Sequence, residues 1–261
     1  MSFDPVPEAA GRPVIFFTPH QDDETLWMGT VIAHHALVGR EVHVVSVTDG
    51  STSAIRNCLN GEEANGWWPA RDHYPYREQI PYLDPNAFAA ARDQELIDAC
   101  AELGVAEQNL HLDWQVPLAD GSTLTRGANI QVPEAEALIH HFAEQYPDAG
   151  HYTTWWGDID PNHSAIGQAL RNLALTSDPA RKILDRRWLV RTRQNPAGSE
   201  LYVLPSTLAD TINGMVRAAV KAYAAWAPRV GRYAIGYHGV PQYFADIEDS
   251  GGKTDRIVKQ P

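Results

Sequence analysis

The sequence predicts an α/β fold, a Rossmann-like doubly wound and mostly parallel sheet with helices on both faces. Short, continuous apolar runs alternate along the chain with longer stretches of helical spacing. The first run, residues 14–17, is continuously apolar, as expected for a strand that is covered on both faces, and a second run, rich in β-branched residues, covers 42–47. A helical stretch separates them, so we expect parallel strands joined by a right-handed crossover.

The expected elements follow in order along the chain. After the strand over 14–17 comes a helix over 24–38, ended by Gly39, and then the strand over 42–47. Residues 51–86 lack periodicity, and so long an irregular segment is usually functional or mobile. Further helices are expected over 87–103, 133–145 and 163–175, and further strands over 109–112, 152–155, 188–192 and 201–204. A last helix is expected over 206–226 with Ser206 as N-cap, followed by an irregular aromatic tail over 232–247.

The length suits one domain over residues 1–261, with a core over about 13–205. The C-terminal helix and aromatic tail, residues 206–261, are expected to pack near the functional site. The formal charge of -12 and the lack of a basic cluster argue against nucleic acid as a partner. No apolar run approaches the length of about 20 residues that spans a bilayer. We expect a cytoplasmic protein without a disulfide framework, and the question of a homo-oligomer stays open.

Acidic and histidine side chains follow the first predicted strand, namely His20, Asp22, Asp23 and Glu24. Ligands of open α/β sheets bind beyond the carboxyl ends of the strands, where a dinucleotide-binding protein would carry glycines. These side chains suit a divalent cation instead. A catalytic zinc site takes three protein ligands and leaves a position open for water. His20 and Asp23 can supply two, and His163, which follows another predicted strand, can supply the third.

Residues 19–24 resemble the Pro-His-x-Asp-Asp-Glu motif of the LmbE-like, or PIG-L, N-deacetylase superfamily, and 158–163 look like a variant of its second motif. The resemblance covers about residues 13–175 and, more loosely, 233–238. It implies a zinc-dependent hydrolase, although another divalent metal can serve, that removes an N-acyl group from an amino sugar or its conjugate. It also implies that His20, Asp23 and His163 are the metal ligands, that Asp22 is the general base and that Arg92 contacts the substrate.

The second motif departs from the family pattern at two positions. Asp160 stands where the family often has His, and Asn162 stands where it has Asp. An ionised Asp cannot donate a hydrogen bond to an oxyanion, so the donor must come from elsewhere. We consider His238 in the aromatic tail for that role, and alternatively Asp160 as a residue that orients a ligand histidine.

Aromatic residues suggest where a sugar-like substrate binds. Trp67 and Trp68 lie in the irregular segment, and Trp156 follows a predicted strand. Aromatic faces with polar edges suit sugar rings, although each ring can instead anchor a loop.

Two alternatives to the deacetylase hypothesis stay open. One is another metal-dependent hydrolase such as a phosphoesterase, which would need basic residues around the phosphate. The other is a non-catalytic ligand-binding member of the fold.

Overall fold

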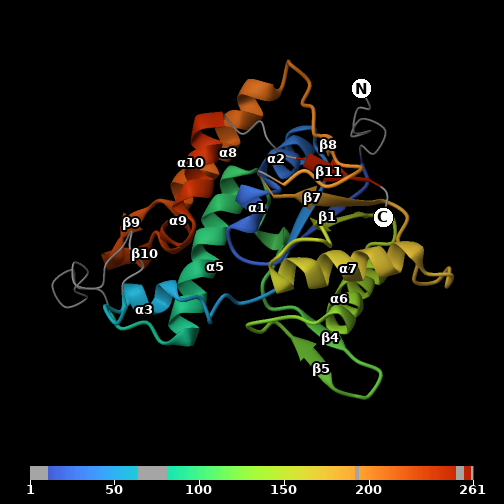
Figure 1. Cartoon of the computed structure of the whole chain (residues 1–261), viewed down its shortest axis with the longest axis horizontal. Helices are drawn as coiled ribbons and strands as arrows, with labels where there is room; N and C mark the ends of the chain where they lie inside the picture. Colours follow the sequence, from blue (N-terminus) through green and yellow to red (C-terminus); the bar gives the residue numbers. More distant parts are fainter. Residues whose placement is uncertain (1–10, 64–80, 192–193, 251–255, 260) are drawn as a thin grey trace.

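The structure is a computed structural model that describes residues 11–63, 81–191, 194–250, 256–259 and 261 (Figure 1). Its main strands are β1 (Val14–Thr18), β2 (Val42–Ser46), β3 (Leu110–His111), β6 (Gly150–Thr154), β7 (Arg186–Val190), β8 (Glu200–Leu201) and β11 (Arg256–Val258). Two hairpins stand apart from them, one of β4 (Gln115–Pro117) and β5 (Thr123–Thr125), the other of β9 (Trp226–Ala227) and β10 (Arg232–Tyr233).

The central sheet is mostly parallel, as predicted. Its strand order is β3-β2-β1-β6-β7-β11-β8. The neighbours from β3 to β7 pair in parallel, whereas β11 pairs antiparallel with both β7 and β8. The chain moves outward from β1 to β2 and β3, and then returns to the other side of β1 with β6 and β7. The direction of winding therefore reverses between β1 and β6, which is where open α/β sheets bind their ligands.

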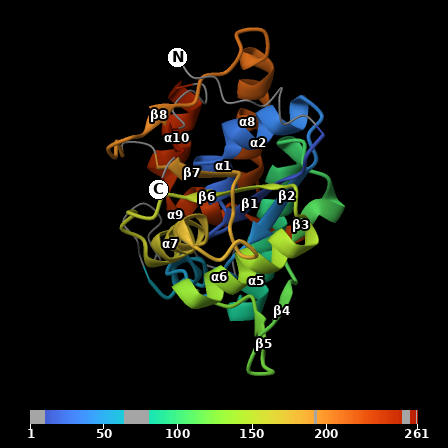
Figure 2. The ribbon, with the colours of Figure 1, turned by 90° about the vertical axis from the view of Figure 1, so that its right-hand side faces the viewer.

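Helices cover both faces of the sheet (Figures 1 and 2). The helices are α1 (Asp23–Leu26), α2 (Gly29–Leu37), α3 (Ile55–Leu59), α5 (Pro85–Glu102), α6 (Val132–Gln145), α7 (Pro161–Leu175), α8 (Ala209–Tyr223), α9 (Ile235–Gly239) and α10 (Pro241–Ser250), with 3-10 turns η2 (Glu107–Asn109) and η3 (Pro228–Val230). Side chains of α2, α5 and α8 share one apolar cluster with the sheet, and those of α6 and α7 share another. The doubly wound prediction is confirmed.

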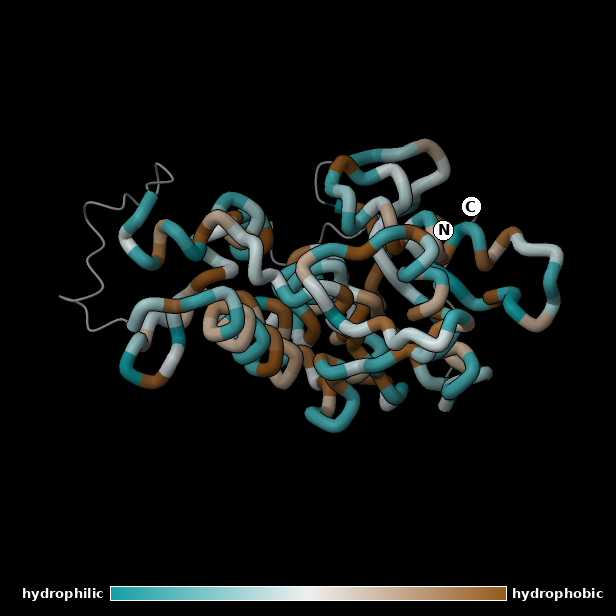
Figure 3. Tube along the Cα trace, turned by 90° about the horizontal axis from the view of Figure 1, so that it is seen from below, coloured by the Kyte–Doolittle hydropathy of each residue, from teal (hydrophilic) through white to brown (hydrophobic). Residues whose placement is uncertain are grey.

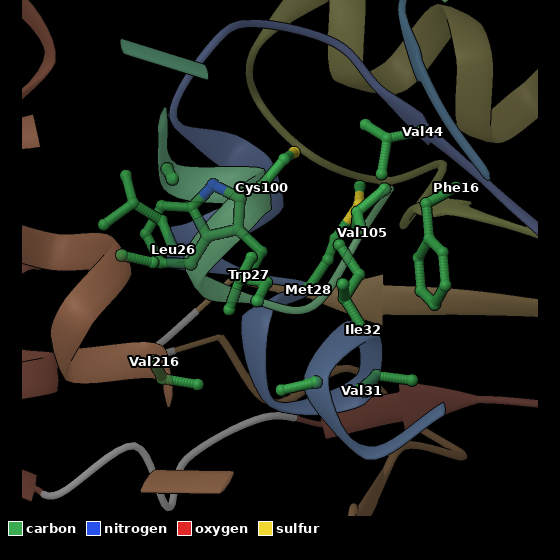
Figure 4. Close-up of a cluster of buried hydrophobic side chains, with 14 of the residues drawn as sticks. Phe16, Leu26, Trp27, Met28, Val31, Ile32, Val44, Cys100, Val105 and Val216 are labelled. Atoms are coloured by element: carbon green, nitrogen blue, oxygen red, sulfur yellow. The ribbon is translucent and has the colours of Figure 1, made fainter. Parts of the chain in front are cut away.

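The apolar cores follow from the alternation of side chains along buried strands. Phe16 packs with α2, α5 and α8, and its neighbour Phe17 packs with α6 and α7. Apolar stretches gather in the middle of the molecule, whereas the outer loops are largely hydrophilic (Figure 3). Figure 4 shows Leu26, Trp27 and Met28, at the junction of α1 and α2, projecting into the first of these cores.

Several local predictions were wrong. The segment over 51–86, expected to be irregular, contains the short helix α3. The helix expected over 24–38 is divided into α1 and α2, because the chain leaves helical geometry at Trp27. Ser206 is not an N-cap, since α8 begins at Ala209 and has no side-chain cap. The tail expected to be irregular contains α9 and α10, whose short aromatic and glycine-containing sequences do not show an extended helical period. Among the described residues, no helix is both long and apolar enough to cross a bilayer.

Candidate active site

A cavity of about 390 Å³ opens at the carboxyl ends of β1 and β6, where the winding of the sheet reverses. Its lining combines residues from the loops after β1, β2, β6 and β7 with others from α5 and the C-terminal helices. Among the described residues, the polar and charged side chains that line the cavity are those of His20, Asp22, Asp23, Thr52, Ser53, Arg92, Asp160, Asn162, His163, Arg191 and Tyr243. The fold therefore gathers side chains from distant parts of the sequence at one place.

The loop after β1 holds Asp22 in a conformation that L-residues rarely adopt. Asp22 has φ 131° and ψ -29°, outside the helical and extended regions. Its backbone N–H donates to Glu24 Oε2 at 3.0 Å, and Tyr223 donates its hydroxyl to Glu24 Oε1 at 2.9 Å. Glu24 is fully buried, and that burial raises its pKa to about 8. Strain of this kind is typical of functional sites and needs such surrounding contacts to persist.

Three potential ligand atoms converge from the loop after β1 and from α7. His20 Nδ1 lies 3.1 Å from His163 Nε2 and 3.2 Å from Asp23 Oδ2. The third side of this triangle, from His163 Nε2 to Asp23 Oδ2, is 2.9 Å. Four-coordinate zinc with bonds of about 2.0–2.1 Å separates its ligand atoms by about 3.3 Å. The donor set and its spacing therefore fit a zinc-type centre.

The other contacts of Asp23 orient its carboxylate toward the two histidines and favour its charged form. Its Oδ1 accepts a hydrogen bond from Trp27 Nε1 at 2.6 Å, which leaves Oδ2 facing the two histidines. Burial favours the neutral acid, but the charge and hydrogen bonds of His163 and His20 outweigh it and lower the pKa of Asp23 well below its usual value. The same charge contact raises the pKa of His163 against the effect of burial. A cation at this position would therefore displace a proton.

Asp22 lies beside the cluster but is paired with a different partner. Its Oδ2 accepts a hydrogen bond from Arg92 at 3.1 Å, and Arg92 also donates to the backbone carbonyl of Gln21. Burial raises the pKa of Asp22 to about 6, although the charge of Arg92 opposes the shift. Gly50 (φ 67°) lines the same wall, and a Cβ there would lie 2.6 Å from the Gln21 side chain. Arg92 and Asp22 thus form a compact pair at the cavity wall.

Asp160 caps the helix that carries His163. Its Oδ1 accepts from the backbone N–H groups of Asn162, at 2.9 Å, and of His163, at 3.2 Å, as an N-cap carboxylate does. Close packing of α7 on the end of β6 depends on Gly167, where a Cβ would lie 2.6 Å from the carbonyl oxygen of Thr154. Cap and packing together determine where His163 enters the cavity.

Asn162, the second departure from the family pattern, lies behind His20. Its Oδ1 accepts the backbone N–H of Ile130 at 3.1 Å, and its Nδ2 is 3.1 Å from His20 Nε2. Asp158 has the corresponding place behind His163, with its Oδ2 3.6 Å from Nδ1. In each histidine, the ring nitrogen that faces away from the other two ligand atoms therefore lies near a polar side chain.

A second set of candidate ligands overlaps the first. His20, Asp160 and His163 offer ligand atoms that all lie within 4.8 Å of one another. In that set Asp160 Oδ1 is 3.9 Å from His20 Nε2 and already accepts two backbone hydrogen bonds. Asp23 Oδ2 is closer to both histidines, which makes it the better third ligand.

The structure does not bring every predicted site residue into the cavity. His238 is absent from the described lining; its Nδ1 lies 2.6 Å from the carbonyl oxygen of Ala234, and its ring packs against Trp226. Trp156 is also absent from that lining, because it packs against Trp188 and under Arg171. Trp67 and Trp68 lie outside the described residues.

Other lining residues were missed by sequence reasoning. Arg191 and Tyr243 contact each other at the cavity wall, with the guanidinium carbon 5.3 Å from the ring centroid. Arg191 directly follows a parallel strand, and that position was a usable signal. Tyr243 carried no such signal, since it reaches the cavity through the fold of the C-terminal helices.

The sequence matches a known protein family, and the fold resembles known structures. The family described as "PIG-L: GlcNAc-PI de-N-acetylase" matches residues 15–174. No curated protein sequence matches the chain. Among solved structures, the zinc-inhibited form of teicoplanin deacetylase Orf2 is similar, with a TM-score of 0.51, 15% identity and coverage of 95% of this chain and 98% of that one.

Two further structures share the fold. N,N'-diacetylchitobiose deacetylase from Pyrococcus horikoshii has a TM-score of 0.53 and 15% identity, covering 95% of this chain and 84% of that one. The 4-carboxy-2-hydroxymuconate hydratase GalB from Pseudomonas putida KT2440 has a TM-score of 0.51 and 14% identity, with 95% of each chain covered. At these identities the likeness shows the fold alone. The family match spans more than half of the chain and includes His20, Asp22, Asp23 and His163. The chain therefore belongs to the PIG-L family of de-N-acetylases.

Proposed function

We propose that this enzyme is a zinc-dependent N-deacetylase that hydrolyses the N-acyl group of an amino sugar or an amino-sugar conjugate. The observation that carries the proposal is the convergence of His20 Nδ1, Asp23 Oδ2 and His163 Nε2, each 2.9–3.2 Å from the next, with Asp22 beside them. These three side chains would hold the metal. When bound, a zinc ion supplies Lewis-acid activation of water and of the amide carbonyl.

Asp22 is proposed as the general base. Its carboxylate lies in the cavity beside the proposed ligands but is held by Arg92 rather than by the histidines. It would accept the proton of the attacking water and later deliver it to the leaving nitrogen. Burial raises the pKa of Asp22 to about 6, which brings the carboxyl closer to the range in which a group can both take and return a proton.

The substrate class is supported by the family and by the shape of the site. The cavity of about 390 Å³ has room for a sugar ring and is lined by polar groups together with Trp27, Ile55 and Tyr243. Two solved structures of this fold are described as deacetylases of teicoplanin and of N,N'-diacetylchitobiose. Both names denote small molecules. We propose a ligand of the same kind here, with Arg92 in contact with it.

The test combines metal analysis with product detection. The purified protein is expected to retain about one zinc per chain and to release acetate from at least one member of a panel of N-acetyl sugars. Removal of the metal with a chelator should abolish acetate release, and added zinc should restore it. The Asp22→Asn variant is the matched control, since it keeps the three proposed ligands.

Other outcomes would favour the alternatives. Zinc binding without acetate from any substrate, but with release of phosphate from phosphoesters, would favour a phosphoesterase. Water addition to an unsaturated carboxylic acid would favour a hydratase, a reaction of a protein with this fold. Binding of sugars without any turnover would favour a ligand-binding protein.

A further inference from the structure

Arg191 occupies a position at the cavity that the family motifs do not describe. It directly follows β7, whose carboxyl end lies beside that of β6, and its side chain is 18% exposed. The family match ends at residue 174, so Arg191 and its partner Tyr243 both lie beyond it. Figure 1 shows the C-terminal helix α10, which carries Tyr243, on the side of the molecule occupied by α1 and α8.

The guanidinium of Arg191 lies against two aromatic rings that also contact each other. Its central carbon is 5.1 Å from the ring centroid of Trp27 and 5.3 Å from that of Tyr243. The two rings are themselves 4.9 Å apart in an edge-on arrangement. Planar guanidinium groups favour such stacking, and a lysine ammonium does not reproduce it. The position of Arg191 is therefore determined by α10 as well as by its own loop.

On one side, Arg191 is connected to His163. Its NH1 donates to Asp158 Oδ1 at 3.2 Å, and Asp158 Oδ2 lies 3.6 Å from His163 Nδ1. The Asp158 side chain is 1% exposed, so it has almost no contact with water. A buried carboxylate without a cationic partner would be costly. Arg191 provides that partner and keeps Asp158 behind the histidine.

On the other side, Arg191 is connected to Asp23. The Trp27 ring under the guanidinium is the one whose Nε1 donates to Asp23 Oδ1 at 2.6 Å. Displacement of that ring would release Oδ1 and allow the carboxylate to rotate away from the histidines. One guanidinium thus contacts the supports of two of the three proposed ligands.

We propose that Arg191 is a positioning residue of the metal centre, an inference that rests on the proposed function. It holds Asp158 behind His163 and Trp27 behind Asp23, and through Tyr243 it makes the geometry of the ligands depend on α10. The C-terminal region thereby contributes to metal affinity without supplying a ligand. Residues that orient metal ligands typically affect metal affinity or activity by about 10- to 100-fold.

The experiment measures zinc affinity by competition with a chromogenic chelator in Arg191→Gln, Arg191→Lys and Tyr243→Ala. Arg171→Gln is the matched control, because Arg171 stacks on Trp156 at 5.2 Å and lies on α7 together with His163, but does not line the cavity. Arg191→Gln should weaken zinc binding by about 10- to 100-fold. Arg191→Lys should lose less, since it keeps a charge for Asp158, and Tyr243→Ala should lose some affinity with Arg191 intact. Arg171→Gln should match the wild type.

Three results would overturn the inference. Zinc affinity in Arg191→Gln within about twofold of the wild type would show that Arg191 does not position the ligands. A rise in KM with unchanged zinc affinity would assign Arg191 to substrate contact instead. An equal loss of zinc affinity in Arg171→Gln would assign the effect to general destabilisation.

If Arg191→Gln fails to fold, wild-type affinity in both Arg191→Lys and Tyr243→Ala would count against the inference. Absence of zinc binding by the wild type would instead refute the proposed function.

Discussion

Trp27 donates its indole N–H to Asp23 Oδ1 at 2.6 Å, and this contact leaves Oδ2 facing His20 and His163. The donor and acceptor are four residues apart, across the end of α1. Trp27 is 1% exposed, so the surrounding core holds its ring in place. The orientation of a proposed metal ligand therefore depends on the same core that stabilises the fold.

Removing that indole N–H should weaken zinc binding, while a phenylalanine ring at this position still fills part of the core. We expect Trp27→Phe to lower zinc affinity by about 10-fold or more, because Asp23 loses the contact that orients it. Chelator competition measures the change. Trp114→Phe is the control, since Trp114 donates its N–H to the carbonyl of Ser46 and is not among the described residues of the cavity wall. Similar zinc affinities in the two variants would contradict this role of Trp27.

Loss of the carboxylate at Asp22 should separate turnover from metal binding. We expect Asp22→Asn to reduce kcat by about 10²- to 10⁴-fold, the usual contribution of a general base. Zinc content should stay at the wild-type level, because the three proposed ligands are intact. Metal analysis and acetate release on the same preparation test both expectations. Full turnover in this variant would remove Asp22 from the role of base.

Asp160 and His238 can be distinguished by their contacts. Asp160→Ala should lower the free energy of unfolding by about 1 kcal/mol because α7 loses its N-cap, whereas Asp160→Asn should retain most of that stability. Chemical denaturation at neutral pH measures this difference.

His238→Ala should leave kcat/KM within about twofold, since the ring is not among the described lining residues. A large loss of turnover in His238→Ala would restore the oxyanion hypothesis for that residue.

His151 should make the protein sensitive to acid. It is 2% exposed, so its imidazole is almost entirely removed from water. Burial lowers its pKa from 6.5 to about 4, with the charge of Asp185 opposing the shift. As the pH falls below 6.5, the unfolded chain takes up a proton that the folded chain does not. Stability contributed by the neutral ring is therefore present above pH 6.5 and is lost as the pH falls toward 4.

The linkage gives a magnitude for this effect. Between pH 7.5 and pH 5, this histidine should cost the wild type about 2 kcal/mol of unfolding free energy. Over the same interval, the unfolding free energy of His151→Gln should fall by about 2 kcal/mol less than that of the wild type. Denaturant titration at the two pH values measures both. His140→Gln, at a partly exposed position of α6, is the control and should follow the wild type. Identical pH dependence in His151→Gln and the wild type would show that another group is responsible.

Much of the site was predictable because its residues occupy positions that the fold class defines. His20 and Asp23 follow β1, and His163 opens α7 after β6, so a parallel sheet brings them to one edge. A continuous apolar run and the polar cluster after it are local signals, readable without knowing the rest of the chain. The roles assigned to Asp22 and Arg92 came from the family resemblance, and the cavity contains both residues.

The other features depend on contacts between residues far apart in the sequence. Trp27, where the predicted helix is interrupted, packs its ring into the core that it shares with residues of α5 and α8, and a helical period does not indicate that packing. Tyr243 reaches the cavity only through the packing of α9 and α10. His238 lies in the same tail and was expected at the site, but its ring packs against Trp226 instead.

The sequence by itself therefore determined the fold class and the kinds of side chain that meet at the carboxyl ends of β1 and β6. Apolar periodicity and motif composition are properties of short segments, and the right-handed crossover makes their arrangement in a sheet predictable. Only the tertiary structure decided which oxygen of Asp23 faces the histidines, what stands behind each of them, and that Arg191 connects those supports to α10. These relationships depend on the close packing of side chains from separate elements, for which no segment of the sequence carries the information.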